Sequence, residues 1–118
     1  MKNKLKTLLP TLKEKKRYLA FEIVSNNEIK DFSTISGEIM AKTQELIGQL
    51  GIAKAGIQVI KDCFKPKLQK GIIKVGHKSV DELKMALSLI ETINNKKVIV
   101  KSIGVSGILK KAKERYLK

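Results

Sequence analysis

The order of strand and helix patterns along the chain is the feature that most limits its fold. Strand patterns occupy residues 17–24, 56–61, 69–76 and 97–103, and helix patterns occupy residues 33–50, 79–94 and 106–117. Two strand–helix–strand halves, joined by a hairpin, predict a four-stranded antiparallel sheet with two helices on one face. Because crossover connections are right-handed, the strand order becomes 4-1-3-2. We therefore predict an α+β, ferredoxin-like (RRM-like) sandwich with an extra basic helix at the C-terminus.

Local signals mark the boundaries of the two inner helices. Ser33 is a candidate N-cap for the first helix, and Gly51 is its expected stop. The second helix begins with a capping box, Ser79 and Glu82, and ends at Asn94-Asn95. We divide the chain into a basic arm, residues 1–16, and a single domain, residues 17–118, which includes the C-terminal helix. A chain of 118 residues has room for one core.

Positive charge is concentrated at the two ends of the chain. The sequence has 25 Lys and Arg against 11 Asp and Glu, a net charge of +14. Residues 1–18 carry a net +6 and residues 96–118 a net +7, so the middle carries only +1. In the predicted strand order the first and last strands are antiparallel neighbours, which brings the two basic ends to one corner. Such a surface predicts a polyanionic partner.

The last strand leads through a glycine-rich turn into the basic helix. The turn is Gly104-Val105-Ser106-Gly107, in which Ser106 is a potential N-cap. Amides at the start of the helix would point outward, a geometry that suits a phosphate. The helix has one apolar face, made of Ile108, Leu109, Ala112 and Tyr116, and basic residues fill the rest. The alternative is a helix whose charges only keep the protein soluble, as charge runs often do.

No residues have the spacing of a catalytic or metal site. The 11 carboxylates are scattered, and Cys63 and His77 are each the single residue of their type. A zinc site needs several such ligands, and a lone cysteine allows no intramolecular disulfide. We therefore expect no catalytic residue, metal ligand or protein-bound cofactor. Because no apolar run approaches the roughly 20 residues of a membrane span, we predict a cytoplasmic protein without a membrane partner.

The aromatic residues argue against base-by-base reading of single-stranded RNA. RNA-recognition modules stack bases on aromatic residues of their first and third strands. Here Tyr18 and Phe21 lie on the first strand but point to opposite faces, and aliphatic residues fill the third strand. Binding to the RNA backbone by charge and shape is the better inference.

Several short motifs, spread over nearly the whole chain, together resemble one known family. They are Arg17-Tyr18-Leu19 with Glu22, Gly51 with Ala55-Gly56, Gly71-Ile72-Ile73, and Gly104-Val105-Ser106-Gly107 with Leu109-Lys110-Lys111-Ala112. The chain resembles archaeal ribonuclease P protein component 2, the counterpart of a small protein shared by eukaryotic ribonuclease P and ribonuclease MRP. The run from Gly104 into the basic helix is the most specific part of the resemblance.

The resemblance implies a subunit of ribonuclease P, the ribonucleoprotein endonuclease that removes the 5′ leader of precursor tRNA. It implies that the RNA carries out the hydrolysis, with magnesium bound to the RNA, while the protein supports the folded RNA. It also implies a heterotetramer with ribonuclease P protein component 3, in a particle with other ribonuclease P proteins and precursor tRNA as substrate. Two other functions stay open: a small-molecule regulatory domain of ferredoxin-like fold, and a generic protein that binds structured RNA.

We expect the RNA-binding residues to lie where the basic ends meet. The predicted set is Lys15, Lys16, Arg17, Lys101, Ser106, Gly107, Lys110, Lys111, Lys113 and Arg115. The basic side chains would neutralise crowded phosphates, and the amides of Ser106 and Gly107 would hold one phosphate. Apolar residues of the helix 33–50, or the leucines of the arm, would form the face for a protein partner.

Overall fold

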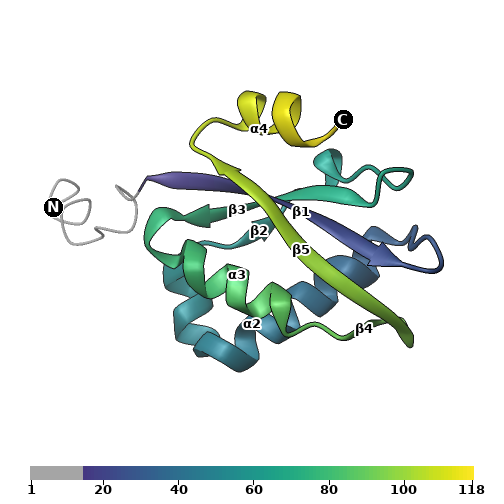
Figure 1. Ribbon diagram of the computed structural model, residues 1–118. Coiled ribbons are helices and arrows are strands. Elements are labelled where there is room, and N and C mark those ends of the chain that lie inside the picture. The colour runs from purple at the N-terminus through teal and green to yellow at the C-terminus, as the bar shows by residue number, and fades with distance from the viewer. Residues whose placement is uncertain (1–14) are drawn as a thin grey trace, which may run out of the picture.

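The computed structural model describes residues 15–118, so the predictions for the leucines of the basic arm lie outside the described residues. Five strands and three α-helices form within this range (Figure 1). The strands are β1 (Lys16–Ser25), β2 (Gln58–Val59), β3 (Lys70–Gly76), β4 (Thr92–Ile93) and β5 (Lys96–Ser106). The helices are α2 (Phe32–Ala55), α3 (Val80–Ser88) and α4 (Leu109–Tyr116), with short 3-10 turns at Lys61–Cys63 and His77–Ser79.

One antiparallel sheet runs through the molecule in the order β2-β3-β1-β5-β4. The central strand β1 pairs with β3 on one side and with β5 on the other. Tyr18 lies opposite Ser106, and Leu19 lies opposite Val105, so the predicted pairing of the first and last long strands is confirmed. The predicted four-stranded sheet of order 4-1-3-2 is nevertheless incomplete, because β4 adds a fifth strand beside β5.

The prediction misses β4 because it assigns Asn94-Asn95 to the end of a helix. Helix α3 ends at Ser88 instead, and the two asparagines join β4 to β5. Their φ angles are 54° and 64°, both positive, as a type I′ hairpin turn requires at its two central residues. Asparagine adopts this left-handed conformation more readily than most residues with a side chain.

Helix α2 extends beyond its predicted range at both ends. Asp31, rather than Ser33, is the N-cap, and its Oδ1 accepts the N–H of Ser33 at 3.1 Å. Gly51 does not stop the helix; the C-cap is Gly56, at φ 60°. Gly48, at φ 75° and ψ 171°, breaks the helical path inside α2 and divides it into two helical segments. Positive φ angles, which favour glycine, therefore occur at Gly48 and Gly56.

Two smaller differences concern the ends of β2 and α3. Strand β2 covers only Gln58–Val59 of its predicted range, because the chain turns into a 3-10 helix at Lys61–Cys63. Ser79 is the N-cap of α3, but its side chain makes no capping hydrogen bond, so the predicted capping box is wrong.

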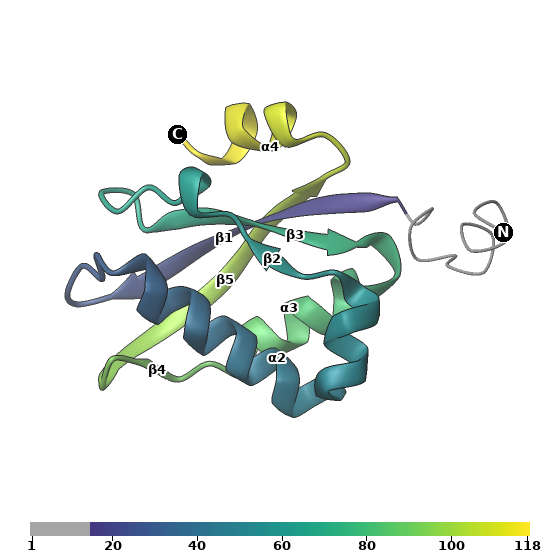
Figure 2. The same ribbon diagram turned by 180° about the vertical axis from the view of Figure 1, so that it is seen from behind.

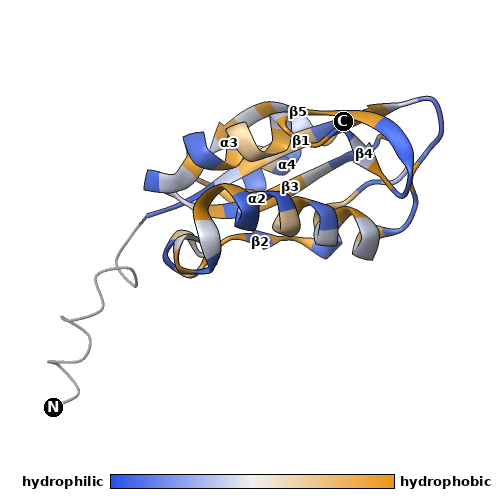
Figure 3. Cartoon of the chain, turned by 90° about the horizontal axis from the view of Figure 1, so that it is seen from below, coloured by the Kyte–Doolittle hydropathy of each residue, from blue (hydrophilic) through white to orange (hydrophobic). Residues whose placement is uncertain are grey.

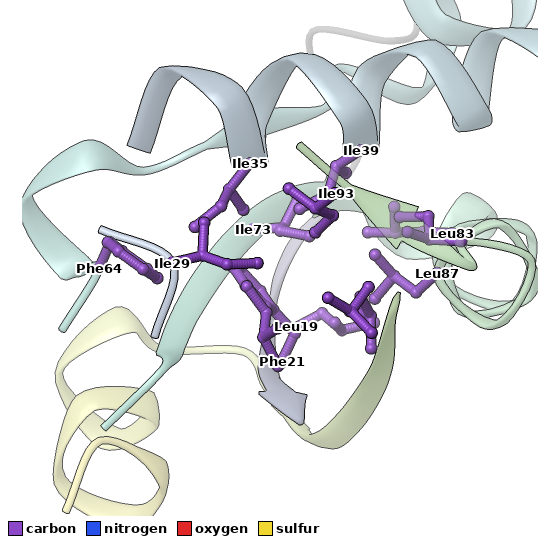
Figure 4. Packing of buried hydrophobic residues seen from close by; sticks show 14 of the residues in the cluster. Leu19, Phe21, Ile29, Ile35, Ile39, Phe64, Ile73, Leu83, Leu87 and Ile93 are labelled. Atoms are coloured by element: carbon purple, nitrogen blue, oxygen red, sulfur yellow. The ribbon is translucent and has the colours of Figure 1, made fainter. Parts of the chain in front are cut away.

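Helices α2 and α3 pack on one face of the sheet and enclose the main core (Figures 1 and 4). Side chains from β1, α2 and α3 point toward one another there, among them Leu19 and Phe21, Ile35 and Ile39, and Leu83 and Leu87. Seen from the helical side, both helices carry hydrophilic residues between hydrophobic ones (Figure 3). Within residues 15–118, no helix is both long enough and apolar enough to cross a bilayer.

Candidate nucleic-acid interface

Helix α4 lies on the opposite face of the sheet from α2 and α3 (Figures 1 and 2). A second, smaller apolar cluster holds it there, with a buried centre of Ala20, Cys63, Ile72 and Ala112. Tyr18, Ile60, Leu109, Tyr116 and Leu117 pack around this centre. The sheet is therefore covered on both faces, and Tyr18 contacts protein rather than offering a free platform for a base.

A close contact between Gly104 and Tyr116 lets α4 approach the sheet. A Cβ atom at position 104 would overlap the ring and hydroxyl of Tyr116. Only glycine leaves room for this ring against β5. Gly104 thus has a packing role within β5, which runs to Ser106, instead of the predicted role in a turn.

The side of α4 that faces away from the sheet is basic. Lys110, Lys111, Lys113 and Arg115 are all exposed, whereas Ala112 between them is fully buried. Leu109, Ala112 and Tyr116 form the packed face as predicted. Ile108 does not, because it precedes the helix as the N-cap residue and is 53% exposed.

The connection into α4 is shorter than predicted, because β5 continues to Ser106. Ser106 belongs to β5 and is not the N-cap. Its Oγ accepts the N–H of Ile108 at 3.2 Å, and the hydroxyl donates to the Ile108 carbonyl at 3.1 Å, so the serine stabilises the bend. The first hydrogen bond of the helix runs from the N–H of Ala112 to the carbonyl of Ile108. The free amides at the start of α4 are therefore those of residues 109–111 rather than those of Ser106 and Gly107.

Two of the other predicted residues belong to the strands β1 and β5. Arg17 reaches the turn, with Nη1 3.6 Å from the position of a Cβ on Gly107. Lys101 is exposed on β5 directly opposite Glu22, and Glu22 alternates with Ala20 on the face that α4 covers. We use the name "α4 surface" for the set Arg17, Lys101, Lys110, Lys111, Lys113 and Arg115.

The two other predicted lysines, Lys15 and Lys16, make their contacts with other parts of the molecule. The carbonyl of Lys15 accepts the N–H of His77 at 2.9 Å, beside the entry to α3. The Lys16 ammonium lies at the C-terminal end of α2, where Nζ is 2.7 Å from the position of a Cβ on Gly56. The structure therefore places the Lys16 ammonium beside the C-cap of α2 and not beside the basic helix.

The prediction missed a second group of cations near α4, the lysines of the β2–β3 connection. We call them the hairpin lysines: Lys61, Lys65, Lys67 and Lys70. The 3-10 turn buries Cys63 in the cluster beneath α4 and so brings the connection to that side of the sheet. Burial raises the pKa of the Cys63 thiol, while the nearby charges of Lys113 and Lys65 partly oppose that rise. Lys70 Nζ also donates to the Lys118 carbonyl at 3.1 Å.

Comparison with known proteins identifies the family. A model of the Rpp14/Pop5 family matches residues 17–117. The chain belongs to the Rpp14/Pop5 family. It is 40% identical to ribonuclease P protein component 2 of Pyrococcus abyssi over 97% of this chain and 94% of the relative. It is 38% identical to the protein of that name from Thermococcus kodakarensis, over 99% and 95% of the two chains.

A more distant relative agrees with this assignment, and a solved structure has a similar fold. The ribonuclease P protein component 2 of Methanosarcina acetivorans is 36% identical over 97% of this chain and 83% of its own. A chain in the cryo-EM structure of yeast ribonuclease MRP superposes with a TM-score of 0.59 at 14% identity, covering 80% of this chain and 75% of that one. This match shows a shared fold. The resemblance seen in the motifs is thus confirmed.

The Rpp14/Pop5 match includes the parts of the chain that build the α4 surface. It begins at residue 17, the first residue of that surface, and continues to residue 117, beyond the end of α4. In residues 15–118 the one ion pair is Lys42–Glu45 on α2, so the cations around α4 have no carboxylate partner there. The same residues contain no group of three His, Cys, Asp or Glu side chains arranged to hold a metal ion. The arrangement can therefore bind a polyanion by charge.

Proposed function

We propose that this chain is a protein subunit of ribonuclease P and binds the ribonuclease P RNA through the α4 surface. The observation that carries the proposal is the 36–40% identity, over nearly the whole chain, to ribonuclease P protein component 2. The charge distribution supports it, since exposed cations that attract phosphates lie together on one face and form no ion pair within residues 15–118.

In this mechanism the protein assists catalysis without supplying the reacting groups. Cations of the α4 surface neutralise phosphates that the folded RNA must crowd together. The amides at residues 109–111 supply further donors for one phosphate. The RNA cleaves the 5′ leader of precursor tRNA, with magnesium bound to the RNA rather than to this chain. We place the particle in the cytoplasm.

The protein partner, on this proposal, is ribonuclease P protein component 3, in a heterotetramer within the larger particle. Exposed apolar side chains on α2 and α3 support a protein contact on the side away from α4. Leu50 is 71% exposed on α2, Met85 is 56% exposed on α3, and Leu89, the C-cap residue of α3, is 48% exposed. Leu46, 38% exposed, lies in the same helix but on the other side of the break at Gly48. Apolar side chains grouped outside the core are typical of protein interfaces.

Reconstitution of precursor tRNA cleavage tests the proposal. The assay combines the cognate ribonuclease P RNA, this chain and component 3, and it measures the cleavage rate with and without the chain. We expect the chain to raise the rate at a magnesium concentration where the RNA alone is slow. A chain that leaves the rate unchanged, or that binds an unrelated structured RNA of equal length as tightly, would support the generic RNA-binding function instead.

A further inference from the structure

A groove lies between the β1–α2 loop and the β2–β3 connection, outside the α4 surface. Its volume is about 750 Å³, and Glu28, Lys30, Lys65, Pro66, Lys67 and Leu68 line it. All six residues are exposed. Neither the sequence motifs nor the proposed function assigns a role to this groove.

The side chain of Gln69 fixes the two walls of the groove relative to each other. Its Oε1 accepts the N–H of Ile29 at 2.9 Å, and its Nε2 donates to the carbonyls of Ile29, at 2.9 Å, and Pro66, at 2.7 Å. Ile29 is 4% exposed and belongs to the main core, so the hydrogen bonds of Gln69 anchor both loops to the body of the molecule. Gln69 itself has a φ of 54°, a conformation that turns its backbone back into β3.

The lining of the groove combines an apolar contact with an excess of positive charge. Pro66 and Leu68 supply the apolar part, and Leu68 is 39% exposed. Lys30, Lys65 and Lys67 surround them, against the single carboxylate of Glu28. A nucleotide has the matching chemistry, because its base offers an apolar face and its phosphates carry negative charge.

The groove begins where the α4 surface ends. The C-terminus of α4 lies next to the β2–β3 connection in both opposite views (Figures 1 and 2). Lys70 contacts the Lys118 carbonyl, and Lys65 pairs with Lys70 across the hairpin. Lys70 and Lys101 also flank Glu22 on the neighbouring strands. Lys65 and Lys70 therefore connect the C-terminal end of α4 with the lining of the groove.

We propose that this groove binds an unpaired nucleotide of the RNA that lies on α4. The base rests against Pro66 and Leu68, and the flanking phosphates contact Lys30, Lys65 and Lys67. The inference rests on the proposed function, since it extends the same RNA beyond α4. It adds a preference for a single-stranded segment, which the α4 surface alone does not have.

Crosslinking tests the groove without any substitution. The cognate ribonuclease P RNA, substituted with 4-thiouridine, is bound to the full chain, irradiated and digested, and the linked peptides are identified. We expect crosslinks on the peptide that contains Leu68 as well as on α4. Crosslinks confined to α4 would overturn the groove and leave the proposed function intact, whereas the absence of any crosslink would overturn both.

A substitution tests the preference for a single strand. The probes are a labelled uridine oligonucleotide of about 10 nucleotides and an RNA duplex of the same length. We expect Leu68→Ser to weaken binding of the single strand about fivefold and to leave the duplex unchanged. The control is Ile99→Ser, at an isoleucine on β5 that is 58% exposed and belongs to neither the groove nor the α4 surface; it should change neither affinity.

Three results would overturn the inference. Leu68→Ser could leave both RNA affinities unchanged, or weaken single strand and duplex equally, and in either case the groove would not recognise an unpaired base. It could instead weaken binding of component 3 with RNA affinity intact, which would make the groove a protein site. If Leu68→Ser does not fold, the crosslinked peptides decide the question.

Discussion

The contact between Gly104 and Tyr116 controls how α4 meets the sheet. Position 104 has no space for a Cβ because the tyrosine ring occupies it. The same helix covers Cys63, which is 1% exposed in the cluster beneath α4. Gly104 therefore allows α4 to pack against β5, and α4 in turn shields the Cys63 thiol from solvent.

We predict that Gly104→Ala displaces Tyr116 and loosens α4. Overpacking of this kind costs about 1–3 kcal/mol in the free energy of unfolding. The Cys63 thiol should then react faster with a thiol reagent at neutral pH, because burial now both shields it and raises its pKa. The measurement is the rate of thiol labelling, together with denaturant unfolding.

Gly37→Ala is the matched control for this substitution. A Cβ at position 37 meets nothing within 4 Å, and the residue lies inside α2. Alanine should stabilise the helix by up to about 1 kcal/mol and leave the labelling rate unchanged. A Gly104→Ala variant that labels as slowly as the wild type would show that Tyr116 does not hold α4.

At the scale of elements, the residues of α4 that pack against the sheet are different from those that carry charge. Its buried residue is Ala112, so its exposed lysines can be changed without touching the core. The helices α2 and α3 on the other face carry exposed lysines too, for example Lys54 and Lys84. Two lysines can therefore be removed from either face, which gives two variants of equal net charge to compare.

We predict that Lys110→Ala combined with Lys111→Ala weakens RNA binding and preserves the thermal unfolding midpoint. An exposed charge pair contributes roughly 0.5–1 kcal/mol, so the loss of two contacts lowers affinity about 5- to 30-fold. Lys54→Ala with Lys84→Ala removes the same charge from the opposite face and should lower affinity far less. Equal effects of the two double substitutions would mean that net charge, and not the α4 surface, governs binding.

The sequence predicts the elements that have an extended pattern of apolar residues. It misses the features that depend on the backbone conformation of one or two residues. The run of aromatic and branched residues in β1 and the 3.6-residue spacing in α4 are strong signals, and both elements form, although α4 begins at Leu109 instead of residue 106. The hairpin at Asn94-Asn95 is missed because β4 has only 2 residues and leaves almost no pattern. Gly51 is taken as the helix stop because glycine is a good C-cap, but the chain uses Gly56.

At the scale of the whole molecule, the sheet divides the surface into two sides. On one side lie α2 and α3 with exposed apolar residues, and on the other lie α4 and the hairpin lysines (Figure 1). Antiparallel pairing of β1 with β5 was enough to predict that Arg17 lies near α4. The hairpin lysines could not be predicted this way, because their position depends on the 3-10 turn that buries Cys63.

We predict that no single carboxylate of this chain is needed for cleavage by the reconstituted particle. The carboxylates in or near the α4 side are Glu22, Asp62 and Glu114. Glu22→Gln, Asp62→Asn and Glu114→Gln should each retain the cleavage rate at saturating protein, because the mechanism assigns the reaction to the RNA. A variant that binds RNA normally and abolishes cleavage would reveal a catalytic group in the protein.

The central claim is that the α4 surface neutralises RNA phosphates, and the salt dependence of RNA affinity tests it most directly. The measurement is the slope of log affinity against log salt concentration for the wild type, for Lys110→Ala with Lys111→Ala, and for Lys54→Ala with Lys84→Ala. Each lost phosphate contact should make the slope shallower by about one unit. We therefore expect a change of about two units for the α4 variant and none for the variant on the opposite face. Identical slopes for all three proteins would contradict the account.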